Sequence, residues 1–213
     1  MLYVYFSGVT LMQALRPSDV HPDLTDDRLQ TLASFFANTR SSVTALHDPL
    51  SGDDVWALGC RGFARARNLL LSKFQSGEWS WFRVIDPSKH FIFAIGSVPI
   101  RFYRGSSKRP PSRILAQSAQ ELAQLSLAFP TDGVESRDLI WRFAIETDFL
   151  GEPSKVVFAA LGKEGGAVIH QWEIPFKMAN VDMKLDVRSD DMIELPSPIV
   201  VVPLVKKKAT QNE

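Results

Sequence analysis

Residues 79–104 read WSWFRVIDPSKHFIFAIGSVPIRFYR, and this stretch decides the fold class of the 213-residue chain. It contains three short runs rich in aromatic and β-branched residues, at 79–85, 90–95 and 99–104. Turn-forming residues separate the runs, at 86–89 and 96–99. Linkers this short exclude the long crossover that parallel strands require. The stretch therefore predicts a meander of three antiparallel strands.

Before this stretch, apolar residues recur at the three- and four-residue spacing of helices. Thr25 can cap a helix over about 26–39, with a buried face of Leu29, Leu32, Ala33, Phe36 and Ala37. A second helix begins at Asp53 or Asp54 and ends near Gln75, with an apolar stripe of Trp56, Cys60, Phe63, Leu70 and Phe74. The stripe predicts that Cys60 is a core residue rather than a nucleophile.

A polar loop, one helix and a second group of strands follow the meander. The loop spans 105–112, and Ser112 can cap a helix over about 113–128. Three further strands are expected at about 138–146, 155–161 and 167–174, with edge strands near 181–187 and 199–205. The order of elements predicts an α+β fold, a mainly antiparallel sheet with an N-terminal helical pair and one helix inserted between two strand groups.

Composition and length indicate one globular domain in a reducing compartment. Apolar residues make up 45% and charged residues 23% of the chain, which excludes a collagen-like or largely disordered protein. We expect one domain over 1–205, helix-rich at 1–76 and sheet-rich at 77–205, and a polar, flexible tail at 206–213. The apolar residues 1–15 are interpreted as a strand or buried segment, and no run is long enough to span a membrane. With a single cysteine, the chain is predicted to be cytoplasmic.

The formal charge is zero over the whole chain but falls into three blocks. Residues 1–60 hold three basic and seven acidic side chains, and residues 61–113 hold eleven basic and two acidic ones. The remaining hundred residues hold ten basic and fifteen acidic ones, so a middle block at +9 lies between flanks at −4 and −5. Two interpretations are open: a surface that attracts phosphate or an acidic partner, or flanks that fold back and neutralise the middle.

The basic block contains candidate ligands for a polyanion, namely Arg101, Tyr103, Arg104, Lys108, Arg109, Arg61 and Arg65. Guanidinium groups bind phosphate oxygens, and an exposed aromatic ring stacks on an unpaired base. Because side chains alternate along a strand, Arg101 and Tyr103 share one face and Phe102 points to the core, so Tyr103 is the expected stacking residue. The alternative is a solvated sheet face whose cations pair with acids such as Glu146.

Motifs of familiar enzymes are absent from the sequence, which has no phosphate-binding glycine loop, zinc-protease histidine pair or Gly-x-Ser-x-Gly elbow. No catalytic residue, metal or cofactor is assigned. Asp182 and Lys184, with Glu146 or Asp148, imitate the carboxylate–lysine set of a metal-dependent nuclease, although strand alternation explains the first two equally well. We predict a non-catalytic protein that binds nucleic acid or an acidic protein. A protein-interaction or scaffold subunit and a metal-dependent nuclease are the alternatives.

Overall fold

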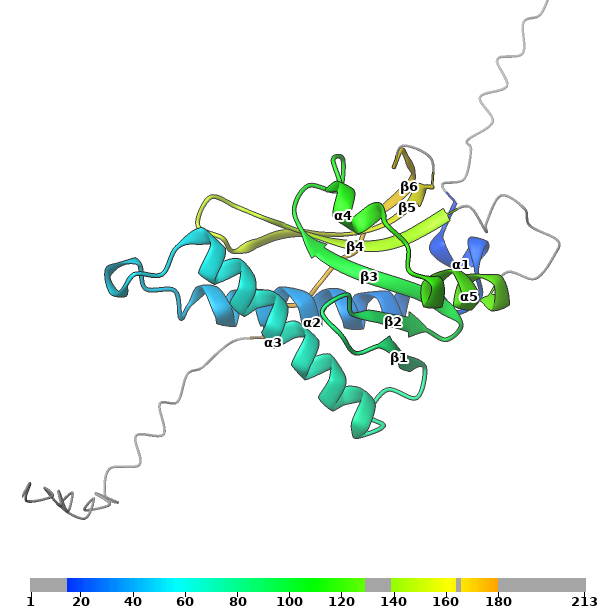
Figure 1. The fold of residues 1–213 in the computed structure, drawn as a ribbon, viewed down its shortest axis with the longest axis horizontal. Helices are drawn as coiled ribbons and strands as arrows, with labels where there is room; N and C mark the ends of the chain where they lie inside the picture. The colour runs from blue at the N-terminus through cyan, green and yellow to red at the C-terminus, as the bar shows by residue number, and fades with distance from the viewer. Residues whose placement is uncertain (1–14, 129–138, 164–165, 180–213) are drawn as a thin grey trace, which may run out of the picture. The chain divides into compact units, whose positions relative to one another are not determined.

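The three aromatic-rich runs form neighbouring antiparallel strands (Figure 1), as predicted: β1 (Phe82–Asp86), β2 (Ile92–Ile95) and β3 (Val98–Arg104). The computed structural model describes residues 15–128, 139–163 and 166–179, all within one unit, residues 1–179. The second strand group is also confirmed, as β4 (Leu139–Thr147), β5 (Pro153–Gly162) and β6 (Val168–Glu173).

One sheet holds these strands in chain order from β1 to β6. Neighbours are antiparallel except β3 and β4, which are parallel and are joined by a crossover through α4 (Ser112–Leu115) and α5 (Ala119–Ala128). The predicted helix over 113–128 is therefore present, with an interruption at 116–118. Ser118 Oγ accepts a hydrogen bond from Glu121 N at 3.1 Å, which starts the second helix. The α+β class, with a mainly antiparallel sheet, is confirmed.

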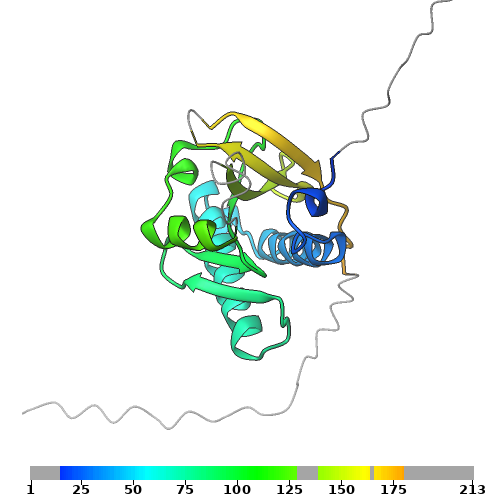
Figure 2. The same cartoon turned by 90° about the vertical axis from the view of Figure 1, so that its right-hand side faces the viewer.

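Two long helices, α2 (Asp26–Thr44) and α3 (Val55–Gln75), follow the short α1 (Pro17–Val20), and the 3-10 turn η1 (Pro49–Ser51) lies between them. All five predicted core positions of α2 are buried. The Phe36 ring on α2 lies 4.9 Å from the ring of Phe102 on β3 and 5.5 Å from that of Phe143 on β4. The main core therefore lies between α2 and one face of the sheet (Figure 2).

The prediction that the apolar stripe of α3 is buried is wrong for three of its five residues. Trp56 is 76% exposed and Phe74 43%, and Cys60 is exposed as well. The buried residues of α3 are Leu58, Ala66 and Leu70. Gly62 shares their four-residue spacing and lets Arg40 of α2 approach, because a Cβ on Gly62 would lie 3.2 Å from Arg40 Nη1. Small residues thus bring α3 close to α2, whereas Trp56, Cys60 and Phe74 are turned away from this contact.

The opposite face of the sheet is covered in part by the crossover. Ile114 of α4 packs in a small buried cluster with Tyr103 of β3, Ala144 of β4 and Val157 of β5. Side-chain alternation along β3 therefore sends Phe102 to the main core and Tyr103 to the crossover side, as the strand pattern predicts.

Several predicted segments lie outside the described residues. These are most of the apolar start, the edge strands near 181–187 and 199–205, and the tail at 206–213. Within the ranges that the structure describes, no helix has both the length and the apolar character needed to cross a membrane.

Candidate functional site

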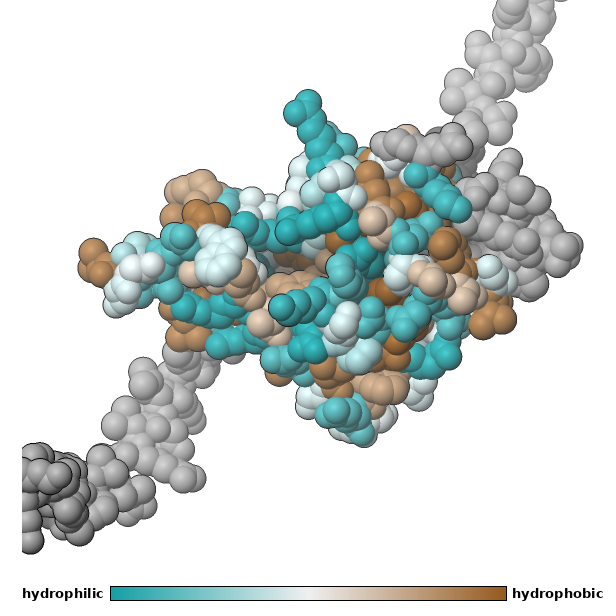
Figure 3. Space-filling model, viewed as in Figure 1, coloured by the Kyte–Doolittle hydropathy of each residue, from teal (hydrophilic) through white to brown (hydrophobic). Residues whose placement is uncertain are grey.

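A cavity of about 830 Å³ opens between α3 and the second half of β3. The pairing of β2 with β3 ends at Phe93 and Ile100, whereas β3 continues along β4 as far as Arg104. Residues 101–104 therefore leave one strand edge uncovered by β2, and these four residues line the cavity. The molecular surface is hollowed at this place (Figure 3). We call this cavity the groove.

Six basic side chains line the groove, and none of its lining residues is Asp or Glu. The six are Arg40, Arg67, Lys89, Arg101, Arg104 and Arg113. Across the described part of the chain, none of them forms an ion pair with a carboxylate. Three are held by backbone carbonyls instead: Arg67 donates to Pro87 O at 2.8 Å, Arg101 donates to Ala116 O at 2.9 Å, and Arg40 donates to Gly151 O at 2.8 Å. The groove is therefore a concentration of positive charge with free anion-binding capacity.

Arg40 is the most buried of these cations, with 6% of its surface exposed. Its Nε donates to Gly151 O at 2.8 Å and its Nη1 to Leu58 O at 3.3 Å, so it joins α2 to α3 and to the β4–β5 turn. Burial lowers the pKa of Arg40, and the like charge of Arg104 lowers it further, although Glu152 opposes these effects. An anion near Arg40 and Arg104 would relieve their mutual repulsion.

Arg101 shows the same effect of burial on the opposite side of β3. Burial lowers the pKa of the half-buried Arg101 guanidinium, the carboxylates Glu121 and Asp86 oppose this, and the charge of Arg113 adds to it. Neither carboxylate lines the groove, and Glu121 is already paired with Arg142. Arg101 and Arg113 therefore carry positive charge that the protein leaves only partly compensated.

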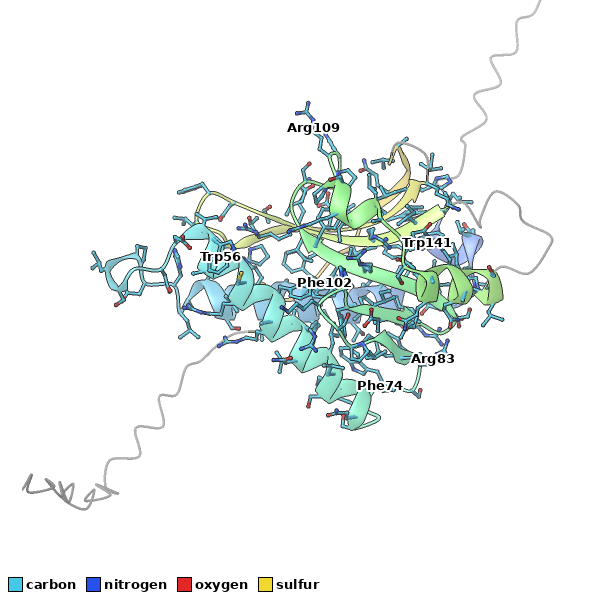
Figure 4. All side chains as sticks on the ribbon, in the orientation of Figure 1. Trp56, Phe74, Arg83, Phe102, Arg109 and Trp141 are labelled. Atoms are coloured by element: carbon cyan, nitrogen blue, oxygen red, sulfur yellow. The ribbon has the colours of Figure 1, made fainter. Side chains whose placement is uncertain are left out.

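The aromatic residue that the groove exposes is Trp56 and not Tyr103. Tyr103 lines the groove but is only 4% exposed, and its hydroxyl donates to Ser106 O at 3.1 Å. Burial raises the pKa of Tyr103 to about 12, and the charge of Glu146 contributes to the rise. The expectation of an exposed Tyr103 is wrong, because α4 covers that face of β3. Trp56, at the start of α3, lines the groove with an exposed ring (Figure 4).

The structure places only three of the seven predicted binding residues in the groove: Arg101, Tyr103 and Arg104. Arg61 pairs with Asp53 of the α2–α3 connection at 2.9 Å, and Arg65 donates to the Ser42 hydroxyl of α2 at 3.4 Å, so both are engaged outside the groove. Lys108 lines a separate, smaller cavity beside Glu146, and Arg109 projects from its loop away from the groove (Figure 4).

Sequence reasoning missed Arg40, Arg67, Lys89, Arg113 and Trp56 as groove residues. One signal for two of them was present. Trp56, Cys60, Phe63 and Arg67 follow helical spacing and so form one face of α3, which combines aromatic rings with a cation. Arg40 had no such signal, because it reaches the groove from the otherwise buried face of α2.

The acidic flanks do not neutralise the basic block in the described part of the chain. Of the eleven cations between residues 61 and 113, only Arg61 and Lys73 form ion pairs with carboxylates there. The partner of Arg61 is Asp53 of the first flank, whereas the partner of Lys73 is Glu78 of the same block. Among the described residues, nine cations of this block therefore have no carboxylate ion-pair partner.

A serine, a histidine and an aspartate meet at the β2–β3 turn without the geometry of a catalytic triad. Asp23 N donates to His21 Nδ1 at 3.1 Å, which places the ring proton on Nε2, 3.3 Å from Ser97 Oγ. Ser97 Oγ in turn donates to Asp23 Oδ2 at 3.0 Å. With Nδ1 accepting and Nε2 protonated, His21 has no site to take the Ser97 proton. Asp23 supports a tight turn, since a Cβ on Gly96 would lie 2.1 Å from its carboxylate.

The structure offers no support for the nuclease alternative. Within residues 15–128, 139–163 and 166–179, no three His, Cys, Asp or Glu side chains are grouped so as to hold a metal ion. Glu146 accepts from Ser107 N at 2.7 Å and from its hydroxyl at 2.8 Å. Asp182 and Lys184 lie outside the described residues.

Comparison of the chain with protein-family models, with curated proteins and with solved structures finds no match in any of the three.

Proposed function

We propose that this chain binds single-stranded nucleic acid in the groove between α3 and β3. The observation that carries the proposal is the lining of the groove, with six cations and no carboxylate. Phosphate contacts from Lys and Arg supply most of the affinity of proteins for nucleic acids. A phosphodiester strand provides the repeated negative charge that such a lining attracts.

The form of the site favours an unpaired strand over a duplex. Proteins that read duplex DNA insert a helix or a pair of strands into a DNA groove, whereas this cation cluster lies in a hollow. The cavity of about 830 Å³ has the size of a ligand pocket and can take a short segment of unpaired nucleotides. Trp56 supplies the exposed ring on which a base can stack.

An acidic protein shares the negative charge of a nucleic acid but lacks its bases. The exposed Trp56 beside the cations is the feature that favours nucleic acid between these two partners. Polyglutamate carries negative charge but has no bases to stack on Trp56. Competition by polyglutamate therefore distinguishes an acidic protein from a nucleic acid.

Two triple variants with equal charge change test where the strand binds. K89Q/R104Q/R113Q removes three exposed groove cations, and R83Q/K108Q/R109Q removes three exposed cations that do not line the groove. Each set contains one lysine and two arginines. Binding of labelled oligo-dT is measured by fluorescence anisotropy at about 50 mM salt, where electrostatic affinity is strong.

We expect the groove variant to lose most of its affinity for oligo-dT and the matched variant to keep nearly all of it. Equal losses in the two variants would show a diffuse charge effect and contradict the groove assignment. No binding by the unaltered protein would end the nucleic-acid proposal. Competition by polyglutamate as strong as that by unlabelled oligo-dT would assign the groove to an acidic protein instead.

A further inference from the structure

Large exposed apolar side chains gather at one end of the described fold. They are Leu46 and Leu50 between α2 and α3, Val55 and Trp56 at the start of α3, and Phe149 and Leu150 in the β4–β5 turn. Six of the thirteen large apolar residues exposed in the described ranges thus fall in two short segments, at exposures from 52% to 100%. Single exposed apolar residues are ordinary, but a cluster marks an interaction surface. We call residues 46–56 and 148–152 the apolar end.

Gly151 ties the β4–β5 segment of the apolar end to α2, the helix that directly precedes the other segment. Its carbonyl accepts from Arg40 Nε at 2.8 Å and from Thr44 Oγ1 at 3.0 Å, both on α2. Gly151 has a φ of 88°, and a Cβ there would lie 3.0 Å from Arg40 Nη2, so glycine alone fits this close approach. Asp148 Oδ1 accepts from the backbone of both Leu150 and Glu152 at 2.9 Å. The exposed Phe149 and Leu150 therefore lie in a turn that hydrogen bonds hold in place.

The charge of the apolar end is opposite to that of the groove. The end carries five carboxylates and no lysine or arginine, the five being Asp48, Asp53, Asp54, Asp148 and Glu152. This charge opposes docking on anionic lipid. The groove has six cations and several apolar side chains, so it is complementary to the end in both respects. Val55 and Trp56 line the groove and also belong to the end, so the two surfaces adjoin.

We propose that the apolar end docks into the groove of a second copy of this chain, in a two-fold dimer that makes this contact twice. Two-fold symmetry requires a self-complementary face, and the adjoining end and groove provide one. A net charge of zero removes long-range repulsion between copies. One consequence rests on the proposed function of the groove: dimerisation and binding of a nucleic acid strand compete.

Sedimentation of the full chain over a wide concentration range, without nucleic acid, tests the dimer. We expect a reversible dimer that L50S/F149S weakens roughly tenfold or more, because both replaced side chains lose apolar burial at the contact. Leu50 and Phe149 are 100% and 94% exposed, so the change leaves the fold intact. The matched variant F74S/L127S replaces the same residue types elsewhere and should dimerise as the unaltered protein does.

A mixing experiment tests the end-to-groove pairing itself. The groove variant K89Q/R104Q/R113Q should also dimerise weakly, because both of its grooves are altered. Mixed with L50S/F149S, it should form a heterodimer more strongly than either variant forms a homodimer, since one contact then joins an intact end to an intact groove. R83Q/K108Q/R109Q should not complement L50S/F149S beyond the level of the unaltered protein.

Several results would overturn the proposal. The unaltered protein could remain a monomer at every concentration, or it could form a dimer that L50S/F149S does not weaken. The mixture of the two variants could also form no more dimer than either variant alone. A monomer that floats with phosphatidylcholine vesicles would assign the end to a lipid surface. Oligo-dT that binds the dimer without dissociating it would place the groove outside the interface. Failure to dimerise leaves nucleic-acid binding by the monomer standing, and failure to bind oligo-dT leaves the dimer standing.

Discussion

Arg101 and Arg142 are register partners on the parallel strands β3 and β4, yet their surroundings differ in kind. Arg142 is fully buried and pairs with the equally buried Glu121 of α5 at 2.5 Å. It also donates to Ile114 O at 2.8 Å, which fixes α4 on the sheet. Arg101 lines the groove and has no carboxylate partner in the described residues.

The comparison separates a cation that holds the fold from one that the fold leaves available to a ligand. A buried charge needs a partner within the protein, since an unpaired one in a low-dielectric interior is strongly destabilising. Apart from the buried Arg40, whose guanidinium donates to two backbone carbonyls, the groove cations keep contact with water and so can remain without internal counter-ions. Because these charges have no carboxylate partner among the described residues, an external anion is the explanation that we favour for their convergence.

The largest expected effect comes from breaking the buried pair. Arg142→Met leaves Glu121 buried without its counter-charge and should lower the free energy of unfolding by about 3 to 5 kcal/mol. Urea denaturation followed by circular dichroism measures this loss. Adding Glu121→Leu to the same chain should recover a large part of it, because the orphaned carboxylate is then gone. A loss below about 1 kcal/mol in the single variant would remove the distinction between the two arginines.

Trp56→Ala should weaken the binding of oligo-dT by about 1 to 3 kcal/mol, because one base loses its stacking surface. The ring is exposed, so thermal stability should change little. Tyr103→Phe is the matched control, since Tyr103 is buried and only its hydroxyl is removed. Anisotropy titrations in dilute protein compare the two variants. Equal affinity of the Trp56 variant and the unaltered protein would exclude stacking at this position.

The salt dependence of binding should differ between groove and matched variants. For single strands, the slope of log affinity against log salt is about −0.7 per phosphate contact. Removing three groove contacts in K89Q/R104Q/R113Q should therefore make the slope shallower by about 2, whereas R83Q/K108Q/R109Q should keep the original slope. Titrations at four or more salt concentrations give both slopes. An unchanged slope in the groove variant would show that these residues do not contact phosphate.

The smallest effect concerns Glu146, a carboxylate outside the groove. The backbone N–H of Ser107 and its hydroxyl hold the pKa of Glu146 below its ordinary value near 4.5, against the opposing effect of burial. Its stabilising contribution is present above that ordinary value and is lost as the pH falls through the lowered pKa. Glu146→Gln should therefore melt at a lower temperature than the unaltered protein at neutral pH. The difference should vanish in strong acid, and a difference that persists there would contradict the linkage.

The strands were predictable because their signals are local. Aromatic and β-branched runs with proline and glycine turns place β1 to β3 within a few residues of their observed bounds. The groove was less predictable because it depends on distant contacts. The groove forms because β2 pairs with only the first part of β3, because Gly62 leaves space for Arg40, and because Trp56 of α3 points to solvent. An aromatic residue at helical spacing is typical of a buried helix face. The pattern alone does not tell which face of α3 packs against α2.

Tyr103 illustrates the same limit within one strand. Alternation correctly separates it from Phe102, but alternation cannot show that α4 covers its face of the sheet. Lys108 and Arg109 follow Arg104 closely in sequence, and their loop nevertheless carries them away from the groove. Proximity along the chain therefore overestimated one part of the site, and it missed the cations that α2, α3 and α4 contribute.

The reactivity of Cys60 tests the central claim most directly. Cys60 is the only cysteine of the chain, its thiol is exposed, and it lines the groove. The rate of its modification by a maleimide is measured in dilute protein, with and without saturating oligo-dT. Our account predicts that the strand slows modification in proportion to the fraction of protein bound, and that this protection is lost in K89Q/R104Q/R113Q. Saturated binding with an unchanged rate of modification would place the nucleic acid elsewhere and contradict the account.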